Sequence, residues 1–333
     1  MEVSEGKLQL SFACGRYDRM APIQSGEVAP EGIRLVTMIL SPADTFLRVA
    51  RGAEFDIAEM SLSGHILHTA RGDGQYVGLP VFTSRTFRHD GVIVRREIED
   101  LDQLVGRRVA VPEYHMTAAL FMRGLLADDR GFDHRSVTWV QAGQYARGRV
   151  ERERLTLPPD VRVERVADRT IDEMLDANEV QAALTPYRSA LFDRPDAPIR
   201  TYYADPRAAA EDWYRRTGVF PIMHLVVVRR SIVERHPWVA ANLVRAFTVA
   251  KDLCLERMEG IGGHPPVALP FFLDQIAQAR ALFGGDLWPY GVDPNRATLE
   301  RACHYSLDQG LSDRLVSVEE LFAPEVVAPP YVD

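Results

Sequence analysis

The sequence contains few cysteines and no excess of positive charge. Its three cysteines, Cys14, Cys254 and Cys303, are odd in number and widely spaced, so we expect reduced thiols rather than disulfide bonds. No metal-ligand spacing occurs among them. Acidic residues outnumber basic ones by 47 to 39, which gives a formal net charge of -8. This balance argues against a nucleic-acid partner, because such a partner calls for a basic face.

Long apolar runs are absent as well. No stretch approaches the roughly 20 apolar residues of a membrane-spanning helix, so we expect no membrane partner. Residues 1–19 show no basic segment followed by a long apolar core, which predicts no signal peptide and a cytoplasmic protein. What the chain does have is length. Its 333 residues, 46% of them hydrophobic, can bury a sizeable core and predict two domains.

Strand-forming runs alternate with helical patterns through the first two thirds of the chain. Strands are predicted at 8–13, 32–40, 55–61 and 76–82, and helices that end at glycine are predicted at 42–52 and 63–72. This succession predicts an α/β protein with a mostly parallel sheet.

A second αβ unit is predicted at 90–131. Its helix begins at Thr117, which we expect to be the N-cap, and ends at Gly131. Segment 145–166 is charged and broken by proline; it predicts a solvated surface excursion, although its arginines could also serve an anion. Beyond a return strand at 224–230 the pattern becomes helical, at 237–258, 269–284 and 294–310.

The order of these elements resembles the type 2 periplasmic-binding-protein fold, and six stretches narrow the likeness. In order along the chain they are "LSFACGRYDRM" (10–20), "EFDIAEMSLSGHI" (54–66), "FTSRTFRHDGVIVRR" (82–96), "VPEYHMTAALFMRGLL" (111–126), "GVFPIMHLVVVRR" (218–230) and "LWPYGVDPNRATLE" (287–300). Together they resemble the 4,5-dihydroxyphthalate decarboxylase family, from about Leu8 to "EELF" at 319–322.

This resemblance implies a two-lobed α/β fold in which one domain is split around an inserted αβ domain. The first lobe would comprise 1–90 and 224–333, and the second would comprise 91–223. Hinge strands are expected near 91–96 and 224–230, with the ligand cleft between the lobes.

The resemblance also implies non-oxidative decarboxylation of a hydroxylated aromatic acid, with 4,5-dihydroxyphthalate as the expected substrate. No cofactor is expected, because a ring hydroxyl can supply the electrons. Two other hypotheses stay open: a cytoplasmic protein that binds or senses a small carboxylate, and a lyase with a different hydroxy-acid substrate. The oligomeric state is open too, although enzymes of this size are often symmetric homo-oligomers.

Such a reaction needs donors for the carboxylates, a base for the phenol and an acid for the ring carbon. Arginines, hydroxyls and a helix N-terminus are the candidate carboxylate anchors: Arg16, Arg19, Ser61, Arg85, Arg88 and Thr117. Aromatic or imidazole side chains that could flank the substrate ring are Phe87, Tyr114, His115, Trp288 and Tyr290.

His224 is the leading acid or base candidate. A histidine inside the apolar run "GVFPIMHLVVVRR" is either a core residue bonded to a carbonyl or a group that opens on the cleft, and the fold favours the cleft. The other acid or base candidates are His65, His89 and His115, with Glu59 and Asp18 as carboxylates. His65 and His68 are spaced to share a helix face and could hold a metal with another histidine, but no established metal-binding motif supports this.

Overall fold

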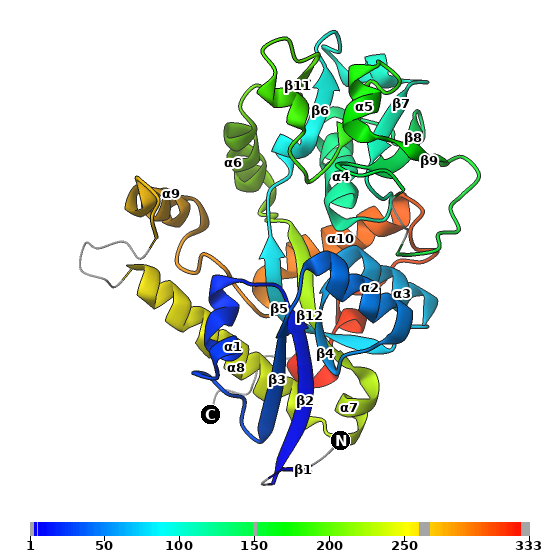
Figure 1. Ribbon diagram of the computed structural model, residues 1–333. Helices are drawn as coiled ribbons and strands as arrows, with labels where there is room; N and C mark the ends of the chain where they lie inside the picture. Colours follow the sequence, from blue (N-terminus) through cyan, green and yellow to red (C-terminus); the bar gives the residue numbers. More distant parts are fainter. Residues whose placement is uncertain (1–2, 5, 149–151, 260–266, 328–333) are drawn as a thin grey trace.

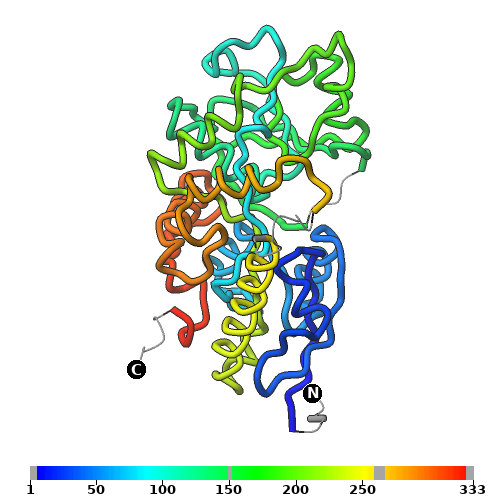
Figure 2. Tube along the Cα trace, turned by 90° about the vertical axis from the view of Figure 1, so that its left-hand side faces the viewer, coloured from blue at the N-terminus to red at the C-terminus, as the bar shows by residue number. Residues whose placement is uncertain are grey.

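Two six-stranded sheets organise the computed structural model, which describes residues 3–4, 6–148, 152–259 and 267–327. The sheets lie one above the other in Figure 1, and the view turned by 90° in Figure 2 shows the same two lobes. None of the described helices is long and apolar enough to cross a membrane.

The lower sheet has the order β1-β2-β4-β12-β5, with β3 paired to the free side of β2. Its strands are β1 (Val3–Ser4), β2 (Lys7–Cys14), β3 (Ile33–Ile39), β4 (Ile57–Ser61), β5 (Tyr76–Arg85) and β12 (Ile222–Arg229). β2, β3 and β4 are parallel, whereas the return strand β12 runs antiparallel to both β4 and β5. The sheet is therefore mixed rather than mostly parallel.

Helices flank this sheet and follow from their sequence patterns. α2 starts at proline after an N-cap serine, Ser41, whose side chain accepts a hydrogen bond from Asp44 N. Gly72 ends α3 in the left-handed conformation that glycine adopts without strain. The helices of this lobe are α1 (Ala21–Ser25), α2 (Pro42–Gly52), α3 (Leu62–Arg71), α7 (Arg230–Arg235), α8 (Trp238–Glu259), α9 (Phe272–Phe283) and α10 (Arg296–Asp308).

The upper sheet has the order β11-β6-β10-β7-β8-β9. Its strands are β6 (Val92–Arg95), β7 (Arg108–Val111), β8 (Thr138–Gly143), β9 (Arg162–Thr170), β10 (Ala182–Leu184) and β11 (Ile199–Thr201), and its helices are α4 (Thr117–Arg130), α5 (Ile171–Asp176) and α6 (Pro206–Thr217). β9 is an edge strand that begins near the end of segment 145–166, which the sequence analysis expected to be a solvated surface excursion, and runs four residues beyond it. Its side chains are half-buried or exposed.

Two sequence-based expectations need correction. Thr117 is the first residue of α4 and not its N-cap, which is Met116 and offers no side-chain cap. The predicted hinge strands lie in different sheets, since β6 belongs to the upper sheet and β12 to the lower one. The chain crosses between the sheets in the segments 86–91 and 202–221.

The C-terminal helix α10 packs against α4 of the upper lobe at a close approach. A Cβ added to Gly124, in the middle of α4, would lie 2.2 Å from Cε2 of Tyr305 on α10. At Gly64, inside α3, an added Cβ would meet nothing closer than 3.8 Å. The two helical glycines therefore differ in what occupies the space beside them.

Gly124→Ala should lower the free energy of unfolding by about 1–3 kcal/mol, because overpacking outweighs the gain in helix propensity. Gly64→Ala is the matched control and should raise it by up to about 1 kcal/mol. Urea unfolding of both variants checks the pair. Equal effects of the two substitutions would contradict the close approach of α4 and α10.

Candidate active site

A cleft of about 410 Å³ lies between the two lobes. The lower lobe supplies the start of α2, the end of β4 and two residues of β12, and the upper lobe supplies the start of α4 and the turn after β10. The lining residues are Ser41, Pro42, Ala43, Phe46, Ser61, Arg88, Met116, Thr117, Ala118, Arg152, Pro186, Tyr187, Met223 and His224.

His224 meets this cleft from the central strand β12. Its Nδ1 lies 2.7 Å from Oε1 of Glu59 on β4, and its side chain is 20% exposed. The ring also packs edge-on against Phe46, with 4.8 Å between the ring centroids. The pairing of β12 with β5 is irregular on both sides of His224, so the strand departs from regular geometry at this residue.

Glu59 is fully buried behind His224 and accepts hydrogen bonds from two other parts of the lower lobe, the turn after β2 and the strand β5. Its carboxylate accepts hydrogen bonds from Gly15 N at 2.9 Å, Tyr17 Oη at 2.6 Å and Thr83 Oγ1 at 3.0 Å. Burial would raise the pKa of Glu59, but the hydrogen bonds from His224, Tyr17 and Gly15 outweigh it and lower the pKa to about 2.

The ionised carboxylate fixes the tautomer of His224. A carboxylate can only accept, so Nδ1 of His224 must carry a proton and donate it to Glu59. Nε2 is then the ring nitrogen that can reach a molecule in the cleft. The pair can deliver or remove a proton at Nε2, while Glu59 itself does not line the cleft and acts by positioning the ring.

Arg88 brings a positive charge to the cleft from the crossing segment 86–91. Its Nε contacts Sδ of Met223 at 3.3 Å, and no carboxylate among the described residues forms an ion pair with it. Burial lowers the pKa of Arg88 below its usual range. An anionic ligand would supply the partner that this half-buried guanidinium lacks.

The N-termini of α3 and α4 meet beside the cleft. Thr117 Oγ1 lies 2.8 Å from Ser61 Oγ and 3.0 Å from Ser63 Oγ, and it accepts a hydrogen bond from Ser63 N at 3.0 Å. Ser63 Oγ donates in turn to the carbonyl of His115. These contacts join the two lobes, and the uncapped start of α4 places Thr117 and Ala118 at the cleft, where helix N–H groups favour an anion.

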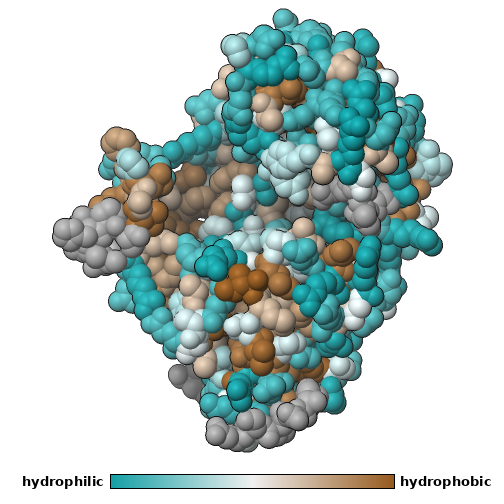
Figure 3. All heavy atoms as spheres, viewed as in Figure 1, coloured by the Kyte–Doolittle hydropathy of each residue, from teal (hydrophilic) through white to brown (hydrophobic). Residues whose placement is uncertain are grey.

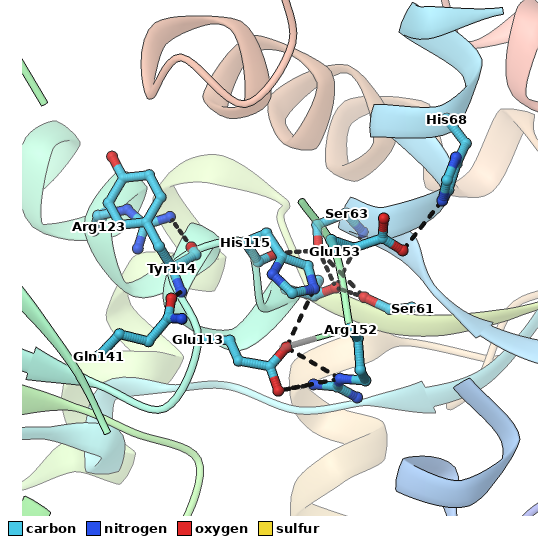
Figure 4. A network of polar contacts seen from close by, with 11 residues as sticks. Ser61, Ser63, His68, Glu113, Tyr114, His115, Arg123, Gln141, Arg152 and Glu153 are labelled. Carbon is cyan, nitrogen blue, oxygen red and sulfur yellow. Dashed lines mark hydrogen bonds and ion pairs between the residues drawn. The ribbon is translucent and has the colours of Figure 1, made fainter. Parts of the chain in front are cut away.

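Arg152 closes another side of the cleft. Its guanidinium pairs with the buried Glu113 at 3.0 Å and lies over the Phe46 ring, 5.6 Å from the centroid. The neighbouring Glu153 accepts from Nε2 of His68 on α3 at 3.1 Å, so this segment of the upper lobe is tied to the lower one (Figure 4). The charge of Arg152, unlike that of Arg88, is already balanced by a carboxylate.

Of the residues predicted from the sequence, the structure brings Ser61, Arg88, Thr117 and His224 together in the cleft, with Glu59 behind them. Arg85 and Phe87 lie outside this lining and face a different cavity. His115 is also outside the lining; it is buried beside Glu113, with 3.3 Å between Nε2 and Oε2.

The remaining candidates have structural contacts of their own. Arg19 lies against the rings of Tyr17 and Trp288 and forms an ion pair with Asp18 at 2.9 Å. The indole Nε1 of Trp288 donates to the Phe82 carbonyl. Arg16 and Asp18 are exposed, and Tyr290 is buried beside Lys251. Tyr114 is fully buried under the guanidinium of Arg123, 3.9 Å from its centroid. None of these residues lines the cleft.

His65 is a core histidine bonded to a carbonyl, which is the arrangement that the sequence analysis gave as the alternative for His224. It is buried, its Nε2 lies 2.7 Å from the Leu321 carbonyl, and burial lowers its pKa to about 4. His68 makes separate hydrogen bonds to Asp73 and Glu153, so the two rings share no ligand position. Across the described part of the chain, no three histidine, cysteine, aspartate or glutamate side chains form a group that could hold a metal ion.

The sequence analysis missed several residues that shape the site. Tyr17 and Thr83 donate to Glu59, Phe46 packs on His224, and Arg152 and Tyr187 line the cleft. Arg152 had a signal in the arginine density of segment 145–166. Tyr17 and Thr83 had none, because strand pairing brings them to Glu59.

Comparison with known proteins places the chain among named relatives. A Comamonas testosteroni protein named 4,5-dihydroxyphthalate decarboxylase is 39% identical over 321 residues, which covers 96% of this chain and 97% of that protein. A Pseudomonas putida protein of the same name is 40% identical over 212 residues, or 63% of this chain and 82% of that protein. No protein-family model matches the chain.

Solved structures confirm the predicted fold. The periplasmic aliphatic sulphonate binding protein SsuA from Escherichia coli has a TM-score of 0.56 at 10% identity and covers 96% of this chain and 99% of its own. The alkanesulfonate-binding protein SsuA from Xanthomonas axonopodis pv. citri, bound to MOPS, has a TM-score of 0.51 at 11% identity, with 97% and 99% covered. At such low identity the likeness concerns the two-lobed architecture alone.

The lowered pKa of Glu59 makes a prediction for acid stability. Its pKa is about 2 when folded and about 4.5 when unfolded, so its stabilisation is complete above pH 4.5 and is lost as the pH falls toward 2. Between pH 5 and pH 3 the unfolding free energy of the native protein should fall by about 1–2 kcal/mol more than that of Glu59→Gln. Urea unfolding at several pH values measures this.

Tyr17→Phe removes one hydrogen bond to the same carboxylate and should give a pH dependence between those of the native protein and Glu59→Gln. If all three proteins lose stability in parallel, Glu59 does not carry the charge that we assign to it.

Proposed function

Because the chain belongs to the 4,5-dihydroxyphthalate decarboxylase family, we propose that it converts 4,5-dihydroxyphthalate to 3,4-dihydroxybenzoate and carbon dioxide in the cleft that His224 lines. The observation that carries this proposal is the Glu59–His224 pair, which presents Nε2 to a cleft that also holds Arg88, a cation without an ion-pair partner among the described residues. His224 can transfer a proton, and Arg88 can bind a carboxylate.

The reaction requires a proton to replace a carboxylate on a ring carbon. The hydroxyl para to that carbon gives its proton to water and pushes electron density into the ring. The carbon then takes a proton and forms a C–H bond, and the C–C bond to the carboxylate breaks. Its electron pair restores the aromatic ring as a phenolate, carbon dioxide leaves, and water returns the proton to the phenolate oxygen. We propose that no cofactor is needed, because the hydroxyl supplies the electrons that the step requires.

His224 is the proton donor in this proposal. Before the step, both nitrogens of the imidazole carry a proton. Nε2 transfers its proton to the ring carbon of the substrate, while the Nδ1 proton stays bonded to Glu59, which keeps the imidazole in place. Water then restores the proton on Nε2, so one proton is consumed for each molecule of carbon dioxide released. The carboxylate of Glu59 is buried at the far side of the ring and does not touch the substrate.

The two carboxylates of the substrate need separate anchors. Arg88 offers planar paired donors without a competing carboxylate, and the start of α4 offers backbone N–H groups at Thr117 and Ala118. Arg152 is a weaker anchor because Glu113 already holds it. The rings of Phe46 and Tyr187 provide apolar surface for the flat substrate.

The test is a turnover assay with chelator-treated protein. The native protein should release carbon dioxide from 4,5-dihydroxyphthalate and form 3,4-dihydroxybenzoate. His224→Gln should lower kcat by about 10²–10⁴ while largely keeping the affinity for the substrate, since it removes the proton donor and retains a polar side chain. Stopped-flow absorbance and carbon dioxide release measure both.

Three results would each contradict a part of this proposal. A thermal shift with the substrate but no product would mean that the cleft only binds. Native turnover in His224→Gln would remove His224 from the chemistry. Activity that returns only when a divalent metal is added would overturn the proposed independence from a cofactor.

Arg88→Met should raise KM by roughly 30-fold, which corresponds to about 2 kcal/mol for a lost charged hydrogen bond. Arg88→Lys should recover part of the loss, because a lysine keeps the charge without the planar fork. Arg16→Met is the matched control, since Arg16 is exposed outside the cleft. Steady-state kinetics compare the three. An unchanged KM in Arg88→Met would exclude Arg88 as an anchor.

A further inference from the structure

A second cavity, of about 670 Å³, lies on another side of the crossing segments. Figure 3 shows a hollow between the arm that carries α9 and the upper lobe, with brown apolar side chains along its wall. Segment 85–90, the start of α6 and one side of α9 form the lining, together with Phe220. The residues that line this cavity are distinct from those that line the proposed active site, although segment 85–90 also supplies Arg88 to the active-site cleft.

Two buried polar side chains face this cavity and are poorly satisfied. Arg85 is 6% exposed and donates only to the carbonyls of Phe220 and Pro289, and its Nε has no partner within the described residues. His89 is 1% exposed, and neither of its ring nitrogens has a hydrogen-bond partner there. Buried polar atoms nearly always have partners, so these two side chains offer donors and an acceptor that the described residues leave unused.

The chemistry of these two groups defines the ligand that would satisfy them. No carboxylate of the described chain pairs with Arg85, and burial lowers its pKa to about 9, so an anion would relieve the cost of its charge. Burial also lowers the pKa of His89 to about 4. The neutral ring offers one donor and one acceptor, which matches a hydroxyl group.

The apolar part of the lining is aromatic. Phe87 stacks on Phe220 with 4.8 Å between the ring centroids, and Phe220 lies 4.9 Å from Phe283 of α9. All three rings line the cavity. Such a surface suits a flat ring of the ligand.

The acidic residues of the lining do not oppose an anion at Arg85. Asp90 and Asp205 are exposed, and Asp205 caps α6 by accepting from Ala208 N. Glu211 already accepts from Arg207 and Arg215. Arg85 and His89 are therefore the buried polar residues of the lining, whereas Asp90 and Asp205 are exposed to solvent.

We propose that this cavity is a second binding site for a hydroxylated aromatic carboxylate, with the carboxylate on Arg85, a hydroxyl on His89 and the ring against Phe87, Phe220 and Phe283. The class of ligand follows from the lining alone. That 3,4-dihydroxybenzoate, the reaction product, is the member bound here rests on the proposed function.

The same segment of chain would connect this site to the cleft. Arg85, Phe87 and His89 line the second cavity, and Arg88 lines the cleft. A ligand that holds the first three side chains constrains the backbone that positions Arg88. Occupancy of the second cavity then changes how the cleft binds its carboxylate, which is a coupling between two sites.

Calorimetric titration with 3,4-dihydroxybenzoate tests the proposal. The native protein should bind two molecules per chain. Ala279→Trp, which fills the cavity from α9, should bind one, and Ala281→Trp, on the exposed side of the same helix, should still bind two. His89→Phe should weaken the second event by roughly tenfold. Arg88→Met should weaken binding in the cleft alone, by roughly 30-fold.

One molecule per chain in both the native protein and Ala279→Trp would overturn the second site. The coupling has its own readout: inhibition of turnover by 3,4-dihydroxybenzoate should be mixed in the native protein and competitive in Ala279→Trp, and competitive inhibition in both would overturn it. Two bound molecules without any turnover would refute the proposed function while leaving the second site in place.

Discussion

The hydrogen bond between His224 and the buried carboxylate of Glu59 is the constraint on which the site depends. An ionised carboxylate in a protein interior is stable only when donors surround it, and Glu59 has donors from Gly15, Tyr17, Thr83 and His224. These donors come from β5, β12 and the turn after β2, so one charge on β4 joins these parts of the lower lobe behind the cleft. The same contact aims the imidazole, because its Nδ1 has to face the carboxylate.

The crossing segment after β5 has a comparable role for the positive charges. Arg85 and Arg88 are three residues apart and line different cavities, because the segment passes between the two cavities. Around the cleft the two lobes are joined by Ser61, Ser63 and Thr117, and by the contact of His68 with Glu153. Together with the packing of α10 against α4, these contacts hold the two lobes in place, and Ser61 and Thr117 serve both the cleft lining and the contact between the lobes.

Local patterns predict the elements well and the site only in part. The run 42–52 matches α2, and Gly131 ends α4 as expected, because helix starts and glycine ends are local features. His224 and Arg88 were predicted from their place next to strands that border a cleft. Tyr17 could not be, since its contact with Glu59 spans 42 residues and depends on strand register. Arg85 looked equivalent to Arg88 in sequence, and only the path of the crossing segment separates them.

A cleft between two lobes can bind an anion with donors alone, and the sulfonate-binding proteins share this architecture. Decarboxylation asks for one thing more, a proton held at a fixed point above a flat ring. In the proposed mechanism His224 meets that requirement from β12, the strand that returns to the lower sheet between β4 and β5. Because β12 is paired on both sides, His224 is held by a ladder on each flank and by Glu59 from behind. A proton donor on a loop would have to be ordered by the substrate, whereas this one is in place before the substrate arrives.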